Sequence, residues 1–155
     1  MKKATRLFLK QRPNAEYVMV EEVKLDGALP NHCYQNAEKL AKTNEADLMI
    51  VSGWMVGDYF GERGTPIIPH YWVCNEKTNR YYDSTPKPDN NTQNFDYVED
   101  FDIFKYGSKD AYLPLSLKLL SNGKWQARNE LGTGYIDLDK VDVEQLYKLR
   151  FNSKD

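Results

Sequence analysis

The feature that most constrains the fold is the uncharged run from Leu48 to Val56, which reads LMIVSGWMV. A short apolar run without charges predicts a buried strand. Strand-like segments also outnumber helical ones along the rest of the chain. We therefore expect an α+β fold in which a helix packs on an antiparallel sheet.

Two strand-like segments precede this run. Residues 5–11 and 16–25 are rich in Val, Leu, Phe and Tyr, and the turn-forming residues 12–15 separate them. This pattern predicts two strands joined by a turn.

The hydrophobic period changes between these segments and the buried strand. Apolar residues recur at i, i+4, i+7 and i+8 across residues 32–43, as on the inward face of an amphipathic helix. Asn31 is expected to be the N-cap of this helix. The first helical turn then contains Cys33, facing inward. The inward residues are expected to be Cys33, Ala37, Leu40 and Ala41.

Further strands are expected after the buried run. Residues 57–69 are rich in Gly and Pro, which predicts a loop that resembles a gating or substrate-binding loop. Residues 71–75 and 80–84 predict two short strands joined by a turn at residues 77–78. The polar residues 86–94 predict a flexible excursion.

The C-terminal part of the chain predicts a hairpin, a strand and a helix. Residues 115–119 and 125–128 flank Asn122-Gly123, a signal for a type I′ turn. Residues 134–138 predict another strand, and residues 142–145 form a variant of the capping box that opens a short helix. The inward residues of that helix are expected to be Val143, Leu146 and Tyr147.

Composition and charge exclude several classes of protein. A chain of 155 residues is long enough for one hydrophobic core, so we expect a single domain over residues 1–155. With 21 basic and 23 acidic residues, the chain lacks the excess of positive charge that binds nucleic acid. Neither a signal peptide nor a membrane span is visible, so we expect a cytoplasmic protein whose two cysteines are free thiols.

Three residues can combine into a reaction mechanism, namely Cys33, His70 and Asp83. A thiol is a good nucleophile only as a thiolate, and the N-terminus of a helix favours the anion. An imidazole beside the thiol can take its proton, and a carboxylate beside the imidazole can hold the required tautomer. These residue types therefore predict a Cys-His-Asp catalytic triad.

The spacing of His70 and Asp83 supports this grouping. A turn centred on residues 77–78 pairs positions whose numbers sum to 155, so that His70 pairs with Thr85. Asp83 then lies two residues along the same strand, on the same face as His70. Diagonal neighbours of this kind are about 7–8 Å apart, a distance that the two side chains can span.

Four segments resemble the transglutaminase-like branch of the papain-like cysteine enzymes. The segments are residues 31–37 (NHCYQNA), 51–54 (VSGW), 69–73 (PHYWV) and 82–86 (YDSTP). The resemblance covers roughly residues 30–86. It implies that a helix carrying Cys33 packs on an antiparallel sheet carrying His70 and Asp83.

In that family the cysteine attacks an amide carbonyl, the histidine moves the proton and the acid orients the histidine. Members include transglutaminases, peptidases, amidases and deamidases, together with inactive relatives. The resemblance implies a thioester on Cys33, a protein or peptide substrate and no cofactor. The sequence departs from ordinary papain-type proteases, because His70 follows Cys33 far more closely than the papain-type spacing of about 130–150 residues. A large calcium-dependent transglutaminase is also a poor match, because no calcium-site pattern is visible.

Acyl transfer also needs hydrogen-bond donors for the developing oxyanion. The backbone N–H of Cys33 is expected to be the first donor, and the side chain of Asn31 is a candidate for the second. Trp54 and Trp72 could wall a substrate-binding cleft, although tryptophans more often belong to a core.

Other hypotheses stay open beside the enzyme. The chain could be a catalytically inactive binding module that uses the Trp-lined cleft and the acidic, Tyr-rich residues 95–106 to bind a protein, or a purely structural accessory protein. Zinc bound by His32, Cys33, His70 and Cys74 is not expected, because His70 and Cys74 would lie about 13 Å apart along one strand. A disulfide between Cys33 and Cys74 would need oxidising conditions.

Overall fold

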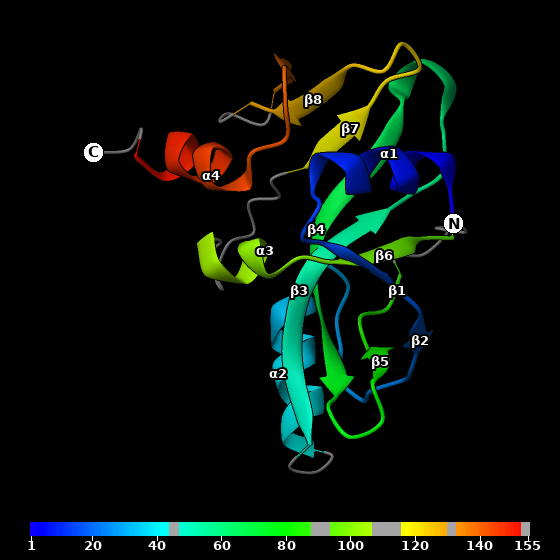
Figure 1. Ribbon diagram of the computed structural model, residues 1–155. Coiled ribbons are helices and arrows are strands. Elements are labelled where there is room, and N and C mark those ends of the chain that lie inside the picture. Colours follow the sequence, from blue (N-terminus) through cyan, green and yellow to red (C-terminus); the bar gives the residue numbers. More distant parts are fainter. Residues whose placement is uncertain (44–46, 88–93, 107–115, 130–132, 153–155) are drawn as a thin grey trace.

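The computed structural model describes residues 1–43, 47–87, 94–106, 116–129 and 133–152. Within them the chain forms an α+β fold of four α-helices and a nine-stranded sheet (Figure 1). The helices are α1 (Lys3–Gln11), α2 (Cys33–Thr43), α3 (Phe101–Tyr106) and α4 (Val143–Asn152). The strands are β1 (Glu16–Val18), β2 (Val20–Glu22), β3 (Leu48–Val56), β4 (Thr65–Asn75), β5 (Arg80–Asp83), β6 (Asp96–Glu99), β7 (Leu117–Leu119), β8 (Trp125–Arg128) and β9 (Tyr135–Leu138).

The apolar run of the sequence forms β3, an interior strand of the sheet. Strand β3 pairs antiparallel with β4 on one side and with β6 on the other. Trp54 and Val56 of this strand are fully buried. The predicted buried strand is therefore confirmed with its predicted bounds.

Strand β4 is shared by two branches of the sheet. One edge of β4 pairs with β3, while the other edge pairs with β7 at Thr65–Ile67 and with β5 at Val73–Asn75. Strand β5 pairs in turn with β2, the one parallel pair among the described strands. Between the two branches, residues 68–72 of β4 have no strand partner on that edge within the described part of the chain. This open edge of β4 lies in the interior of the sheet.

The hairpin of β4 and β5 has the predicted register. Val73 pairs with Tyr82 and Asn75 pairs with Arg80, so the paired numbers sum to the expected value. At the turn, the Asn75 side chain accepts hydrogen bonds from the backbone N–H groups of residues 77 and 78. The turn therefore fixes which residues of the two strands share a face.

The predicted helices of the middle and the C-terminus are also confirmed. In α2, Ala37 and Leu40 are buried, as the helical period predicts. Helix α4 begins after Asp142, whose carboxylate accepts the backbone N–H of Gln145 at 3.1 Å. The inward residues of α4 are buried as expected, and these are Val143, Leu146 and Tyr147.

The N-terminal prediction was wrong in part. Residues 5–11 belong to helix α1 and not to a strand, while residues 16–25 form two short strands, β1 and β2. The buried residues of α1 are Thr5 and Phe8, three positions apart as on one face of a helix. The apolar triplet at residues 7–9 hides this spacing, because it resembles part of a strand.

The Gly- and Pro-rich loop is shorter than predicted. Strand β4 begins at Thr65, and a 3₁₀ turn occupies Gly61–Arg63. At about 3.3 Å per residue, the start of β4 lies about 16 Å along the strand from His70. The loop is therefore not placed next to His70, which corrects the expectation of a gating loop there.

The β7–β8 hairpin is confirmed, but its turn differs from the predicted one. The N–H of Leu120 donates to the Lys124 carbonyl and the N–H of Gly123 donates to the Leu120 carbonyl. Three residues therefore form the loop, with Gly123 at a φ of 84°. Residue 115, expected in the first strand, lies outside the described residues, as do residues 88–93 of the expected excursion.

Residues 95–106 form part of the folded sheet and its cover. They contain β6 and α3, two elements that were not predicted from the sequence. Tyr97, Val98 and Ile103 are buried, while Phe101 is exposed. The acidic, Tyr-rich segment named in the binding-module hypothesis therefore belongs largely to the sheet and to the helix beside it.

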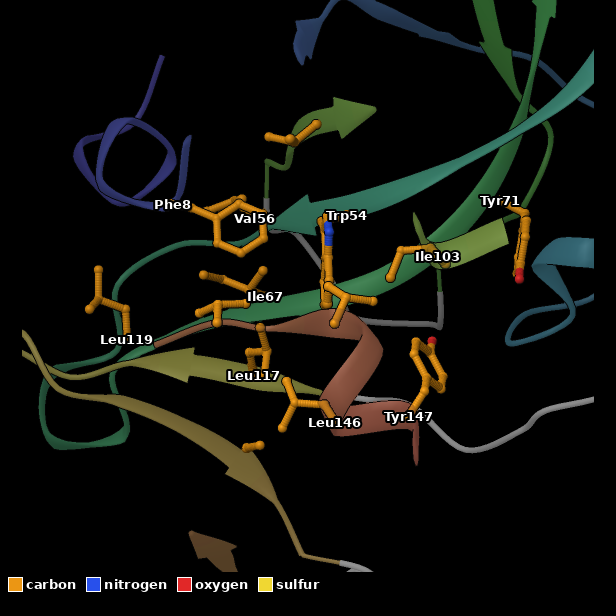
Figure 2. Packing of buried hydrophobic residues seen from close by; sticks show 14 of the residues in the cluster. Phe8, Trp54, Val56, Ile67, Tyr71, Ile103, Leu117, Leu119, Leu146 and Tyr147 are labelled. Carbon is orange, nitrogen blue, oxygen red and sulfur yellow. The ribbon is translucent and has the colours of Figure 1, made fainter. Parts of the chain in front are cut away.

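The main hydrophobic core lies between one face of the sheet and all four helices (Figure 2). Figure 2 shows Trp54 among its neighbours, with Phe8 of α1 and Leu146 of α4 in the same cluster. A smaller cluster covers the opposite face and consists of Val18, Val51, Trp72, Cys74 and Tyr97. Side chains alternate along β4, so Tyr71 and Val73 face the first cluster while Trp72 and Cys74 face the second. Every helix in the described ranges is too short or too polar to span a membrane.

Gly53 of β3 lies in close contact with the neighbouring strands, so a substitution at this position tests how tightly they pack. A methyl group there would overlap the carbonyl oxygen of Val98 and lie 2.7 Å from the Trp72 ring. We expect Gly53→Ala to lower the free energy of unfolding by about 2–3 kcal/mol, measured by urea denaturation. Gly134→Ala is the control, since its new methyl group would lie 3.6 Å from the nearest side chain, that of Asn129. Equal urea midpoints for the two variants would contradict this packing.

Candidate active site

Cys33 is the first residue of α2, and its helical turn is anchored on two sides. The buried Asn36 side chain donates to the Leu29 carbonyl at 2.8 Å and to the Thr85 hydroxyl at 3.1 Å. Ser84 donates its hydroxyl hydrogen to the Asn36 carbonyl at 3.3 Å. The start of α2 is thereby attached both to the loop before it and to the segment that follows β5.

His70 and Asp83 form a buried pair on the β4–β5 hairpin. The Nε2 atom of His70 lies 2.8 Å from Oδ2 of Asp83. The two residues are 5% and 4% exposed, so water screens their interaction weakly. The pairing that the sequence predicts from hairpin register is therefore present as a direct hydrogen bond.

The Asp83 carboxylate has two further donors. The Tyr97 hydroxyl donates to Oδ2 at 2.7 Å, and the Thr85 backbone N–H donates to Oδ1 at 3.0 Å. Together with His70, these groups satisfy both carboxylate oxygens. A buried carboxylate with three donors stays ionised more readily than an unpartnered one.

Cys33 meets β4 at the open edge of that strand. The Gly57 N–H donates to the Pro66 carbonyl on the β3 side, so every second residue from Pro66 onward points its backbone groups toward β3. Tyr71 has the opposite parity and directs its backbone N–H to the open edge. There this N–H forms a hydrogen bond with the Cys33 sulfur.

The charges of the three side chains are coupled. Burial alone would raise the pKa of the Cys33 thiol, but the hydrogen bond and charge of His70 and the Tyr71 N–H hold it below its ordinary value. Burial alone would lower the pKa of His70, whereas Asp83 and Cys33 raise it to about 10. Burial alone would raise the pKa of the Asp83 carboxyl, but its donors, His70 foremost, hold this pKa below the usual range. The site therefore favours the charged form of each group, namely a thiolate on Cys33, an imidazolium on His70 and a carboxylate on Asp83.

The ring nitrogens of His70 have separate partners. Nε2 is engaged by Asp83, so Nδ1 is the nitrogen available to hydrogen-bond the Cys33 sulfur. An imidazolium donates from both nitrogens and can serve both partners at once.

Asn31 does not occupy the predicted position. The helix begins at Cys33, and the carbonyl of His32 accepts the Asn36 N–H, so His32 and not Asn31 precedes the first turn. Asn31 is exposed with a φ of 64°, and within the described residues it forms no hydrogen bond with the triad. Its proposed N-cap role is therefore wrong, and the contacts give no support for its role as an oxyanion donor.

Trp54 and Trp72 are core residues. The Trp54 ring packs on Phe8, and its indole N–H donates to Asp100 at 3.0 Å. Trp72 is 1% exposed and packs edge to face with Tyr97 on the opposite face of the sheet. Neither ring is available to wall an open cleft, which corrects the expectation that they bind substrate.

Cys74 is separate from this site. It is buried four residues beyond His70 on β4, and burial raises the pKa of its thiol. Both cysteines are free, so no Cys33–Cys74 disulfide is present. Within the described part of the chain, no group of three or more His, Cys, Asp or Glu side chains is arranged to hold a metal ion.

Three groups of the site were not predicted from the sequence, namely the side chains of Tyr97 and Asn36 and the backbone N–H of Tyr71. Tyr97 lies on β6, whose partner strand β3 precedes it by about forty positions, so no local turn indicates the pairing. Asn36 has a weak signal, since it is a polar residue next to the inward Ala37 in the helical pattern. The Tyr71 N–H is available because of the open edge, which only the sheet topology reveals.

Comparisons with models of protein families, with curated proteins and with solved structures found no match to this chain.

The two cysteines allow an internal comparison of thiol reactivity. We expect iodoacetamide to alkylate Cys33 at least tenfold faster than Cys74 near pH 7, because a thiolate is the reactive form and only Cys33 has a lowered pKa. The measurement is mass spectrometry of the two cysteine peptides over a time course at several pH values. His70→Ala should slow labelling of Cys33 and leave Cys74 unchanged. Faster labelling of Cys74 would contradict the assignment.

The stability of the protein should depend on pH through Asp83. Folding lowers the pKa of this carboxyl, so its stabilising contribution is present above the unfolded value of about 3.9 and is lost as the pH falls through the folded pKa. We expect Asp83→Asn to destabilise the protein by about 3 kcal/mol at pH 7, with a smaller difference below pH 4, in urea titrations. Asp137→Asn is the control, because Asp137 is exposed and its change should be far smaller. A difference that does not vary with pH would argue against a buried ion pair.

Proposed function

We propose that this chain is a cysteine enzyme that acts on an amide bond through a thioester on Cys33, in the manner of transglutaminase-like enzymes. The observation that carries the proposal is the continuous order of thiol, imidazole and carboxylate on α2, β4 and β5. A thiol at a helix N-terminus beside a buried imidazole is the arrangement that activates a cysteine nucleophile. The resemblance of four sequence segments to that family supports the same conclusion.

In the first step, the Cys33 thiolate attacks the carbonyl carbon of the substrate amide. A carbon–sulfur bond forms, and the electron pair of the carbonyl π bond moves to the oxygen. Cys33 is the first residue of α2, so its backbone N–H has no hydrogen-bond acceptor within the helix. This N–H can therefore donate a hydrogen bond to the oxyanion.

In the second step, His70 acts as the acid. Its Nδ1 proton passes to the amide nitrogen, the carbon–nitrogen bond breaks, and the amine leaves the thioester behind. Neutral His70 then takes a proton from water or from an amine as that nucleophile attacks the thioester. The thiolate leaves, and the thiolate–imidazolium pair is restored.

Asp83 stabilises the positive charge on His70 and orients the ring throughout. With Nε2 held by the carboxylate, the proton exchanged with the substrate is confined to the other ring nitrogen. Water as the second nucleophile gives a peptidase or deamidase, and an amine gives acyl transfer. The substrate class proposed is a protein or peptide.

The alternative, a catalytically inactive binding module, has less support. Trp54 and Trp72 are buried, and most of the apolar side chains of β6 and α3 are covered as well. A triad that lowers the thiol pKa is also unnecessary for binding alone.

Trapping of the acyl-enzyme tests the proposal. Incubation with an activated acyl donor, such as a p-nitrophenyl ester of an N-blocked amino acid, should add one acyl group to the protein by intact-mass measurement. Hydroxylamine should release this group, because it cleaves thioesters. The adduct should vanish in Cys33→Ala, fall at least tenfold in His70→Ala and persist in Cys74→Ala. An adduct that survives Cys33→Ala, or no adduct under any condition, would disprove the proposal.

A further inference from the structure

We propose that Tyr97 is a positioning residue of this site, which holds the Asp83 carboxylate in line with His70 through its hydroxyl. The inference rests on the proposed function and adds a fourth side chain to the three identified from the sequence. The proposed role of Tyr97 is to keep Asp83 and His70 in the relative positions that the reaction needs.

The hydrogen bonds on Asp83 place Tyr97 and His70 on the same oxygen. Both groups bind Oδ2, at 2.7 Å for the Tyr97 hydroxyl and 2.8 Å for the His70 Nε2 atom. Thr85 holds the other oxygen. Without Tyr97, Oδ2 would keep His70 as its single donor, and the carboxylate would be held by two hydrogen bonds instead of three.

The ring of Tyr97 is itself fixed by packing. It is 7% exposed, with its centroid 5.2 Å from that of Trp72 and 6.2 Å from that of His70. Strand β3 separates β6 from β4, and Gly53 lies opposite His70 on it. Because Gly53 has no side chain, none intervenes there on this face of the sheet. The hydroxyl can thus reach across to Asp83 from a rigid position.

Tyr97 acts as a neutral donor at this position. Burial and the neighbouring Asp83 charge both raise the pKa of its hydroxyl, so it stays protonated. The other charged group that acts on it is Glu22 of β2, which is exposed and paired with Lys87 at 3.1 Å. On the triad side, the groups facing Asp83 are His70 and, beyond it, Cys33.

Loss of the hydroxyl should reduce the reactivity of Cys33. With one donor fewer, the carboxylate is held less firmly in line with Nε2, so its hydrogen bond and its charge stabilise the imidazolium less. The imidazole then carries less positive charge toward the sulfur, and the thiolate becomes less favourable. Tyr97→Phe keeps the ring and its packing, so it isolates this contribution.

The experiment is the pH profile of Cys33 alkylation by iodoacetamide, followed on the Cys33 peptide by mass spectrometry. In Tyr97→Phe we expect the rate at pH 6.5 to fall by about three- to tenfold and the apparent thiol pKa to move upward by the corresponding 0.5–1 unit. The same substitution in an Asp83→Asn background should have no further effect, because Tyr97 acts through that carboxylate. A purely structural role would not give this pattern.

Tyr81→Phe is the matched control. Tyr81 also donates its hydroxyl hydrogen to a carboxylate, that of Glu99, at 2.7 Å, but this bond does not touch the triad. Its alkylation profile should match that of the unmodified protein. Urea midpoints of both variants show whether each one is folded under the assay conditions.

The outcomes separate this inference from the proposed function. A lowered thiol pKa in the unmodified protein with an unchanged profile in Tyr97→Phe overturns the role of Tyr97 and leaves the cysteine enzyme intact. An effect that persists in the Asp83→Asn background, or an equal shift in Tyr81→Phe, also overturns it. An ordinary thiol pKa in the unmodified protein, insensitive to His70→Ala, overturns both proposals.

Discussion

The buried carboxylate of Asp83 is the interaction on which the site depends. Removing an ionised carboxylate from water is unfavourable by several kcal/mol unless protein donors replace the lost water. Those donors are His70, Tyr97 and the Thr85 N–H. They come from β4, from β6 and from the segment after β5, so all three are in place only when the sheet has assembled. Formation of the site is therefore coupled to formation of the fold.

The branching of β4 explains how a helix on one face of the sheet meets a histidine on the other. Helix α2 packs against the face that carries Tyr71 and Val73, whereas alternation directs His70 to the opposite face. A neighbouring strand along residues 68–72 would separate them. Because β5 and β7 pair with the two ends of β4 and leave its middle open, Cys33 contacts both the Tyr71 N–H and the imidazole.

The parts of this arrangement that depend on nearby residues were predictable from the sequence. The His70–Asp83 pair follows from one tight turn, since the turn sets the register and the register sets which side chains share a face. The position of Cys33 follows from helical periodicity. Residues 5–11 show the limit of local reasoning, because an apolar triplet is compatible with a strand until Trp54 and Trp125 are known to lie beneath Phe8.

The remaining features depend on contacts between distant segments. Tyr97 reaches Asp83 only because β6 pairs with β3, and Trp54 is a core residue because α1 covers it. The residues proposed to react with substrate thus lie on a helix and a hairpin that form between nearby residues. Tyr97, proposed to position Asp83, lies on β6, which pairs with a strand distant in the sequence. The reacting groups can be identified in the sequence from their residue types and spacing. The groups that set their charge become visible only when the sheet order is known, since any of the 11 tyrosines could have donated that hydrogen bond.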